Sequence, residues 1–152
     1  MKTLKHLAIS ALFLGTQAMA KGEDPYATHI DLICHVSTRT KVTKTTMRFY
    51  EKTREMYFQQ SVIYGSNGDT SQNNPKIFSI SDVFAGNERH LTLTNTDEAF
   101  HVQGSQHLEG FDDKSFELEA TKVTPGYVFI DKLLVNGEDF TESVSDCSLQ
   151  QY

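Results

Sequence analysis

The sequence has no tryptophan and only two cysteines, and it lacks the motifs that mark several large enzyme classes. It contains no G-x-S-x-G, no P-loop, no dinucleotide-binding fingerprint and no H-E-x-x-H. It also has no C-x-x-C pair, and no window after residue 21 keeps a helical stripe of apolar residues. These absences favour a non-enzymatic protein over an enzyme and predict a domain that is not helical.

The one long apolar run lies close to the N-terminus. Residues 1–6 form a short basic segment, and residues 7–15 are apolar apart from Ser10. Ala18-Met19-Ala20 then has the small-x-small pattern of a signal peptidase site. The run is shorter than the roughly 20 residues that cross a bilayer. We therefore expect residues 1–20 to be a cleaved signal peptide. The remainder, residues 21–152, would be periplasmic or secreted, with no membrane insertion after cleavage.

Basic residues are scarce. The chain has 14 lysines and arginines against 20 aspartates and glutamates, a formal net charge of −6. Loss of Lys2 and Lys5 with the signal peptide makes this imbalance larger. An acidic protein is not expected to bind nucleic acid, but it can bind a basic partner. More often an acidic composition reflects only a well-solvated surface. A chain of this length can bury a sufficient core without a cofactor, so none is expected.

Both cysteines lie outside the predicted signal peptide: Cys34 follows it closely in the sequence, and Cys147 is close to the C-terminus. In an exported protein an even number of cysteines is expected to pair. The bond would join the first strand to the last. In the chain-entropy model, closing a loop of this length stabilises the fold by about 4–5 kcal/mol.

Apolar residues recur with a period of two through most of the chain. Ile30, Leu32, Cys34 and Val36 alternate with polar residues, and residues 45–50 and 56–64 resemble the two arms of a hairpin. Later segments alternate in the same way: 116–121, with an acidic polar face, and 127–135, which lies between the turn dipeptides Pro125-Gly126 and Asn136-Gly137. Residues 65–75 are predicted to be a mobile surface loop, and residues 80–84 carry a weak helical pattern.

This pattern predicts an all-β fold for residues 21–152, in a single domain. About eight short strands with regular turn patterns favour a small antiparallel β-barrel whose termini are joined by the disulfide. A two-sheet β-sandwich is the alternative. The sequence does not assign an oligomeric state.

Metal-ligating residues occur without the spacing of a known motif. Two histidine pairs, each six residues apart, could form a zinc or copper site if their strands were adjacent: His29, His35, His101 and His107. Exposed histidines on polar strand faces are the simpler interpretation. A set of acidic residues could bind a hard cation or supply a catalytic acid and base. The same set could simply form a solvated turn and strand face. Its members are Glu109, Asp112, Asp113, Glu117 and Glu119. No metal site is predicted from these patterns.

Aromatic residues suggest a binding surface. Tyr50, Tyr57 and Tyr64 could present amphipathic rings to a partner, or could form cross-strand pairs that stabilise the sheet. The segment around Asn67 and Asp69 and the acidic turn are further candidate contacts, the latter through Glu109, Asp112 and Asp113. These residues predict a non-enzymatic binding or inhibitor module that acts on a protein partner.

The layout resembles the periplasmic lysozyme-inhibitor barrels of Gram-negative bacteria, which are small exported β domains. Their S-G-x-x-Y motif is matched neither at residues 64–68 nor at residues 125–127, so no inhibitory residue is carried over. The first alternative is a carrier of a small apolar ligand inside a β-barrel, although the chain lacks the tryptophan of the lipocalin G-x-W signature. The second alternative is a metal-dependent hydrolase.

Overall fold

The computed structural model describes residues 24–66, 69–72, 75–81, 88–144 and 146–152, so the predicted signal peptide lies outside it. Eleven strands and one 3₁₀ turn, η1, are formed in these ranges. Their bounds are β1 Ile30–Ser37, β2 Lys41–Tyr50, β3 Glu55–Ser66, β4 Asp69–Gln72, β5 Lys76–Ile80, β6 Glu88–Asn95, β7 Ala99–His107, β8 Lys114–Thr124, β9 Tyr127–Val135, β10 Glu138–Asp139, η1 Thr141–Ser143 and β11 Asp146–Gln151. No helix in the described part is long and apolar enough to cross a membrane.

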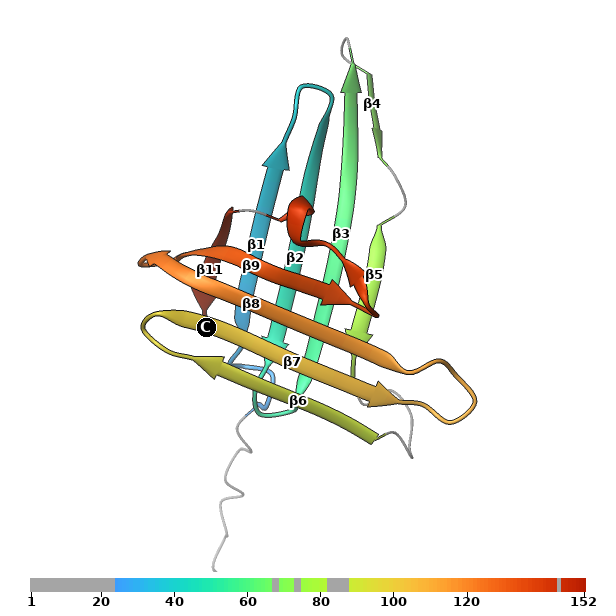
Figure 1. Ribbon diagram of the computed structural model, residues 1–152, viewed down its shortest axis with the longest axis vertical. Helices are drawn as coiled ribbons and strands as arrows, with labels where there is room; N and C mark the ends of the chain where they lie inside the picture. The colour runs from blue at the N-terminus through green and yellow to red at the C-terminus, as the bar shows by residue number, and fades with distance from the viewer. Residues whose placement is uncertain (1–23, 67–68, 73–74, 82–87, 145) are drawn as a thin grey trace, which may run out of the picture.

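The strands form one antiparallel sheet in the order β4-β3-β2-β1-β11-β9-β8-β7-β6, with β5 also paired to β3 and β10 to β9. Neighbours in sequence are mostly neighbours in the sheet. The exceptions are β5, which pairs with β3 rather than with β4 or β6, and β11, which inserts between β1 and β9. In Figure 1 the sheet folds over, so that β6–β9 cross in front of β1, β2, β3 and β5. We call these groups the front layer and the back layer.

The prediction of an all-β antiparallel fold is confirmed, while the predicted barrel closure is not observed. The pairing path is open, with β6 at one end and β4 at the other. The count of eleven strands exceeds the predicted number of about eight partly because β4 and β10 are only four and two residues long. Strands this short carry too few alternating residues for a period of two to be recognised.

The core lies between the two layers and is rich in aromatic rings. Phe49 of the back layer contacts Phe100 and Phe116 of the front layer, with ring centroids 5.5 and 6.0 Å apart. Phe58 packs edge-on against Phe140 at 5.4 Å. Complete burial of such a side chain stabilises the fold by roughly 1.5–3 kcal/mol. Side chains from both layers therefore fill the interior.

The predicted disulfide joins Cys34 of β1 to Cys147 of β11, and both residues are buried. The two cysteines are directly opposed in the antiparallel pair, with a Cα–Cα distance of 4.1 Å. Cys147 also lies opposite Val128 of β9, on the other side of β11. The bond is thus placed where the two layers join.

The predicted turns are present where residues with positive φ are needed. Gly126 has a φ of 80° in the β8–β9 turn after Pro125, as position i+2 of a type II turn requires. Asn136 and Gly137 have φ values of 50° and 77°, which matches the two-residue hairpin turn between β9 and β10.

The prediction of a loop over residues 65–75 was wrong for residues 65–66 and 69–72, which are strands. β3 continues to Ser66, and Asp69–Gln72 form β4, which pairs with Ile63–Ser66. The physical reason is that Asn67-Gly68 is a favoured hairpin dipeptide, and backbone pairing with β3 does not require apolar side chains. Residues 67–68 themselves lie outside the described residues, as do residues 82–87, which include most of the weak helical pattern.

Candidate functional site

Tyrosine rings gather on the outer surface of the back layer. Tyr50 of β2 and Tyr57 of β3 alternate with core residues and therefore face away from the front layer. Their ring centroids lie 6.0 Å apart with the planes at 87°, and Tyr26 contacts Tyr50 in the same edge-on way at 5.2 Å. Edge-to-face packing is the arrangement that aromatic quadrupoles prefer. Tyr26 and Tyr57 remain 47% and 42% exposed.

His29 and Tyr152 extend this cluster toward β1 and β11. Their rings stack with centroids 4.7 Å apart, and the His29 ring also contacts Tyr50 at 5.6 Å. Two backbone hydrogen bonds hold the pair, from His29 N to Tyr152 O and from Tyr152 N to His29 O. We call this set the aromatic face, and its members are Tyr26, His29, Tyr50, Tyr57 and Tyr152.

A partly buried ion pair borders the aromatic face. Arg48 donates two hydrogen bonds to Asp31, from Nε to Oδ1 and from an Nη to Oδ2, both 2.7 Å long. The Asp31 side chain is only 6% exposed. The hydrogen bond to Asp31 raises the pKa of Arg48 above its already high usual range. The guanidinium is therefore fixed in position and fully charged.

Arg48 also lines a shallow groove of about 420 Å³ on this surface. The groove is lined by Thr46, Arg48, Tyr50, Tyr57 and Gln59. It combines aromatic rings with hydroxyl, amide and guanidinium groups. This is the mixture of apolar area and fixed polar groups that is typical of recognition surfaces.

Glu55 lies beneath the aromatic face and is buried there. It receives a hydrogen bond of 3.4 Å from Arg89 Nη1. A hydrogen bond to Glu55 raises the pKa of Tyr26, and burial together with the charge of Glu55 raises the pKa of Tyr57. Both phenols therefore stay neutral at physiological pH, and the single hydroxyl proton of Tyr26 is donated to Glu55.

The structure brings together two of the three tyrosines that the sequence singled out. Tyr64 lies seven residues after Tyr57 on β3, which pairs with β2 without a register shift. An odd separation on a regular strand places two side chains on opposite faces. Tyr64 is exposed but does not belong to the aromatic face.

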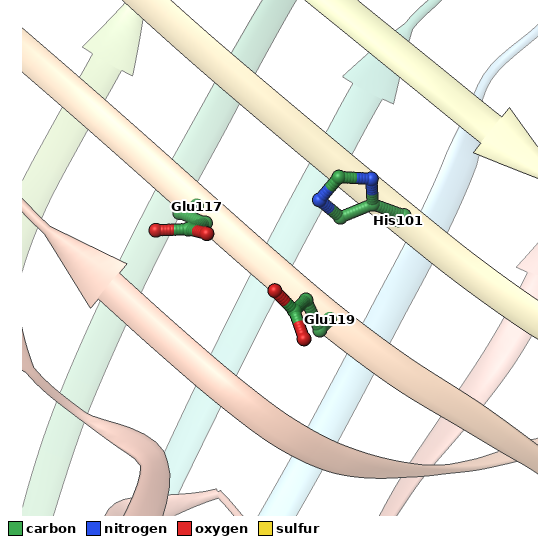
Figure 2. A group of neighbouring side chains, drawn as sticks. All are labelled: His101, Glu117 and Glu119. Atoms are coloured by element: carbon green, nitrogen blue, oxygen red, sulfur yellow. The ribbon is translucent and has the colours of Figure 1, made fainter.

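A second cluster lies on the outer surface of the front layer, and Figure 2 shows its three side chains on neighbouring strands. His101 of β7 is paired with Glu119 of β8, and Glu117 lies two residues earlier on the same face. One potential ligand atom of each residue lies within 4.8 Å of the others. Lys132 of β9 makes a 2.8 Å ion pair with Glu117 and lies 4.0 Å from Glu119. The hydrogen bond to Glu117 raises the lysine pKa.

The two histidine pairs considered as metal ligands lie at strands that are not adjacent in the sheet. β1, beside His29 and bearing His35, is separated from β7 by β11, β9 and β8 in the sheet. In the part of the chain that the structure describes, His101 is the one histidine grouped with two further potential ligands, and both of them are glutamates. His29 belongs instead to the aromatic face.

The acidic turn between β7 and β8 is exposed, as a solvated turn would be. Glu109, Asp112 and Asp113 all lie at the surface. Asp113 Oδ1 is 2.6 Å from Nδ1 of His107, and this hydrogen bond raises the histidine pKa. Asp69 lies in β4, and Asn67 lies outside the described residues.

Sequence reasoning missed Tyr26, Arg48 and Tyr152 as members or neighbours of the aromatic face. Arg48 could have been found from the predicted hairpin, because its position alternates with the core residues Met47 and Phe49. Tyr152 joins the face only through the pairing of β11 with β1, which no local pattern reveals.

Comparison with known proteins gives no relative for this arrangement: no family model, no curated protein and no solved structure matches the chain.

Proposed function

We propose that the protein is an exported, non-enzymatic binding module that holds a basic protein partner on its aromatic face. The observation that carries the proposal is the clustering of four tyrosines and a histidine on one outer surface, with Tyr26, Tyr57 and Tyr152 well exposed. Rigid tyrosine rings provide large contact area at a low cost in side-chain entropy.

Charge favours a basic partner. The chain has a formal net charge of −6, so it attracts cationic surfaces over distances of about a Debye length, near 8 Å at physiological ionic strength. The electron-rich faces of Tyr26, Tyr57 and Tyr152 can in addition hold lysine or arginine side chains by cation–π contact. The fixed Arg48–Asp31 pair is neutral overall and leaves this attraction in place.

The scaffold supports binding at the surface rather than inside. Two crossed layers with aromatic rings packed between them favour the sandwich description over a hollow barrel, and they give the small-ligand carrier no support. The buried disulfide fits an oxidising compartment, as expected for a protein exported by the predicted signal peptide.

The test compares two matched tyrosine substitutions. Wild type, Tyr57→Ser and Tyr127→Ser are immobilised in the disulfide-bonded form, and the proteins that they capture are identified. Each captured protein is then purified, and calorimetry measures its affinity for wild type and for the two variants. Tyr127 is 59% exposed, lies at the start of β9 and is not one of the five residues of the aromatic face. We expect Tyr57→Ser to weaken the partner's affinity at least about tenfold and Tyr127→Ser to leave it unchanged.

Salt dependence tests the chemistry of the partner. A basic partner should bind more weakly as ionic strength rises, because screening removes the long-range attraction. A partner that binds Tyr57→Ser as tightly as wild type contradicts the role of the aromatic face. A partner with an acidic binding surface contradicts the charge argument.

A further inference from the structure

The cluster on the front layer has the composition and placement of a metal site. His101 and Glu119 occupy directly opposed positions on β7 and β8, and Glu117 shares their face. Both strands are interior to the sheet, since β7 is flanked by β6 and β8, and β8 by β7 and β9. The three Cα positions are therefore fixed by hydrogen bonding on both sides, and only the side chains need to move when an ion binds.

A positively charged group already occupies this place. The ammonium of Lys132 lies 2.8 Å from Glu117 and 4.0 Å from Glu119. One lysine charge faces two carboxylate charges, so the local balance is negative even with the lysine present. The side chains of Glu117 and Glu119 are 30% and 49% exposed, which makes their oxygens accessible from solvent.

Space for an incoming ion and its water lies beside the cluster. A shallow depression of about 300 Å³ is lined by His101 and Glu119 together with Thr121 and Asp131. Its mouth opens to solvent on the outer face of the sheet, where nothing in the described chain covers it. An ion could therefore enter without opening the core.

The ligand set selects the kind of ion. An imidazole nitrogen with two carboxylate oxygens suits zinc and its neighbours, whereas calcium and magnesium prefer oxygen ligands alone. With zinc–ligand bonds near 2.0–2.1 Å, ligand atoms in a tetrahedral site lie about 3.3 Å apart. The potential ligand atoms now lie within 4.8 Å of one another. Binding therefore requires side-chain movements that bring these atoms up to about 1.5 Å closer to one another.

We propose that His101, Glu117 and Glu119 bind a zinc-class divalent ion on the outer face of the front layer, and that the ion displaces Lys132 from Glu117. Three protein ligands leave the fourth tetrahedral position to water. This site is independent of the partner surface on the back layer, because its residues belong to β7 and β8, whereas the aromatic face lies on and beside β1, β2, β3 and β11.

The proposal is tested by zinc titration of the disulfide-bonded protein after chelator treatment and dialysis, with calorimetry and elemental analysis. We expect one equivalent of zinc to bind wild type. His101→Ala should weaken this binding at least about tenfold, because it removes the nitrogen ligand. The control His107→Ala removes the histidine beside Asp113 and should leave the affinity unchanged.

Lys132→Met gives a result that nonspecific adsorption would not produce. Removal of the competing ammonium should strengthen zinc binding, since the ion no longer has to displace it from Glu117. In wild type, the ring proton resonances of His101 should shift in step with the first equivalent of zinc. Circular dichroism melting shows whether each variant is folded before titration.

Three outcomes would overturn the proposal: no zinc bound by folded wild type, equal affinity in wild type and folded His101→Ala, or an affinity in Lys132→Met that is the same as or weaker than in wild type. None of these measurements involves a protein partner, so a failure here leaves the proposed function of the aromatic face to its own test.

Discussion

The outer faces of the two layers follow the same alternation of side chains but carry different residue types, aromatic on the back layer and acidic on the front layer. On the back layer the outward positions of β2 and β3 hold Tyr50 and Tyr57. On the front layer the outward positions of β8 hold Glu117 and Glu119. A period of two therefore predicts which residues point outward, and the residue types decide what each surface can bind.

The two faces also differ in how they compensate charge. Asp31 on the back layer is buried and receives two hydrogen bonds from Arg48. Glu117 on the front layer is partly exposed and is matched by Lys132 through one contact. A buried carboxylate depends on its partner because water cannot replace it, whereas an exposed one keeps its hydration. The back layer should consequently be the more sensitive of the two to the loss of a single charge.

Removal of the disulfide that lies where the two layers join should have the largest effect on stability. The double variant Cys34→Ala/Cys147→Ala should lose about 4 kcal/mol of unfolding free energy, because the disulfide closes a loop with a sequence separation of 113. Chemical denaturation at equal protein concentration measures the loss. Unchanged stability would mean that the layers are held together without the bond.

The next effect tests the partly buried ion pair. Arg48→Met should cost about 2 kcal/mol, because it removes two charge-assisted hydrogen bonds from the buried Asp31 carboxylate. The double variant Asp31→Asn/Arg48→Met should recover part of this loss, because it removes the stranded charge. Equal stability of the single and double variants would contradict this explanation.

The matching substitution on the front layer should have a smaller effect. Lys132→Met removes one partner from a pair whose side chains are 40% and 30% exposed, so its effect on stability should be clearly smaller than that of Arg48→Met. Urea denaturation of this variant beside Arg48→Met measures the contrast between the faces directly. A loss as large as that of Arg48→Met would remove the distinction drawn above.

The smallest effect concerns His107 at the end of β7. Its hydrogen bond to Asp113 raises the histidine pKa above the ordinary value, and Asp113→Asn should return it toward that value. The sign of the pH dependence follows from linkage, because the folded state binds the proton of His107 more tightly than the unfolded state does. The contact therefore stabilises the fold at pH values below the unfolded-state pKa, and this stabilisation is lost as pH rises through the folded-state pKa. Both groups are exposed, so NMR titration is the suitable measurement. Identical histidine pKa values in wild type and Asp113→Asn would contradict the contact.

Much of the fold follows from local patterns in the sequence. The alternation around Leu32, the β2–β3 hairpin and the turns at Gly126 and Gly137 were all predicted, because each depends on a few neighbouring residues. The hairpin of β3 and β4 was missed because its residues are polar, and the period of two is read from apolar positions.

The site was harder to predict because its parts meet through pairing between distant strands. His101 and Glu119 come together through the register of β7 and β8, and a slip of one residue would have separated them. Tyr50 and Tyr57 meet across a predicted hairpin, whereas Tyr64, which the sequence grouped with them, lies on the opposite face of β3. Tyr152 required knowledge of the sheet order.

The insertion of β11 between β1 and β9 has a consequence for folding. Without residues 146–151, β1–β3 and β6–β9 are two separate meanders, and the positions of β1 and β9 that pair with β11 lack their partners. Contacts such as Ile30 with Gln151 span almost the whole described chain, and non-local pairing of this kind slows folding. The protein should therefore mature slowly and be most prone to aggregation before the last strand docks.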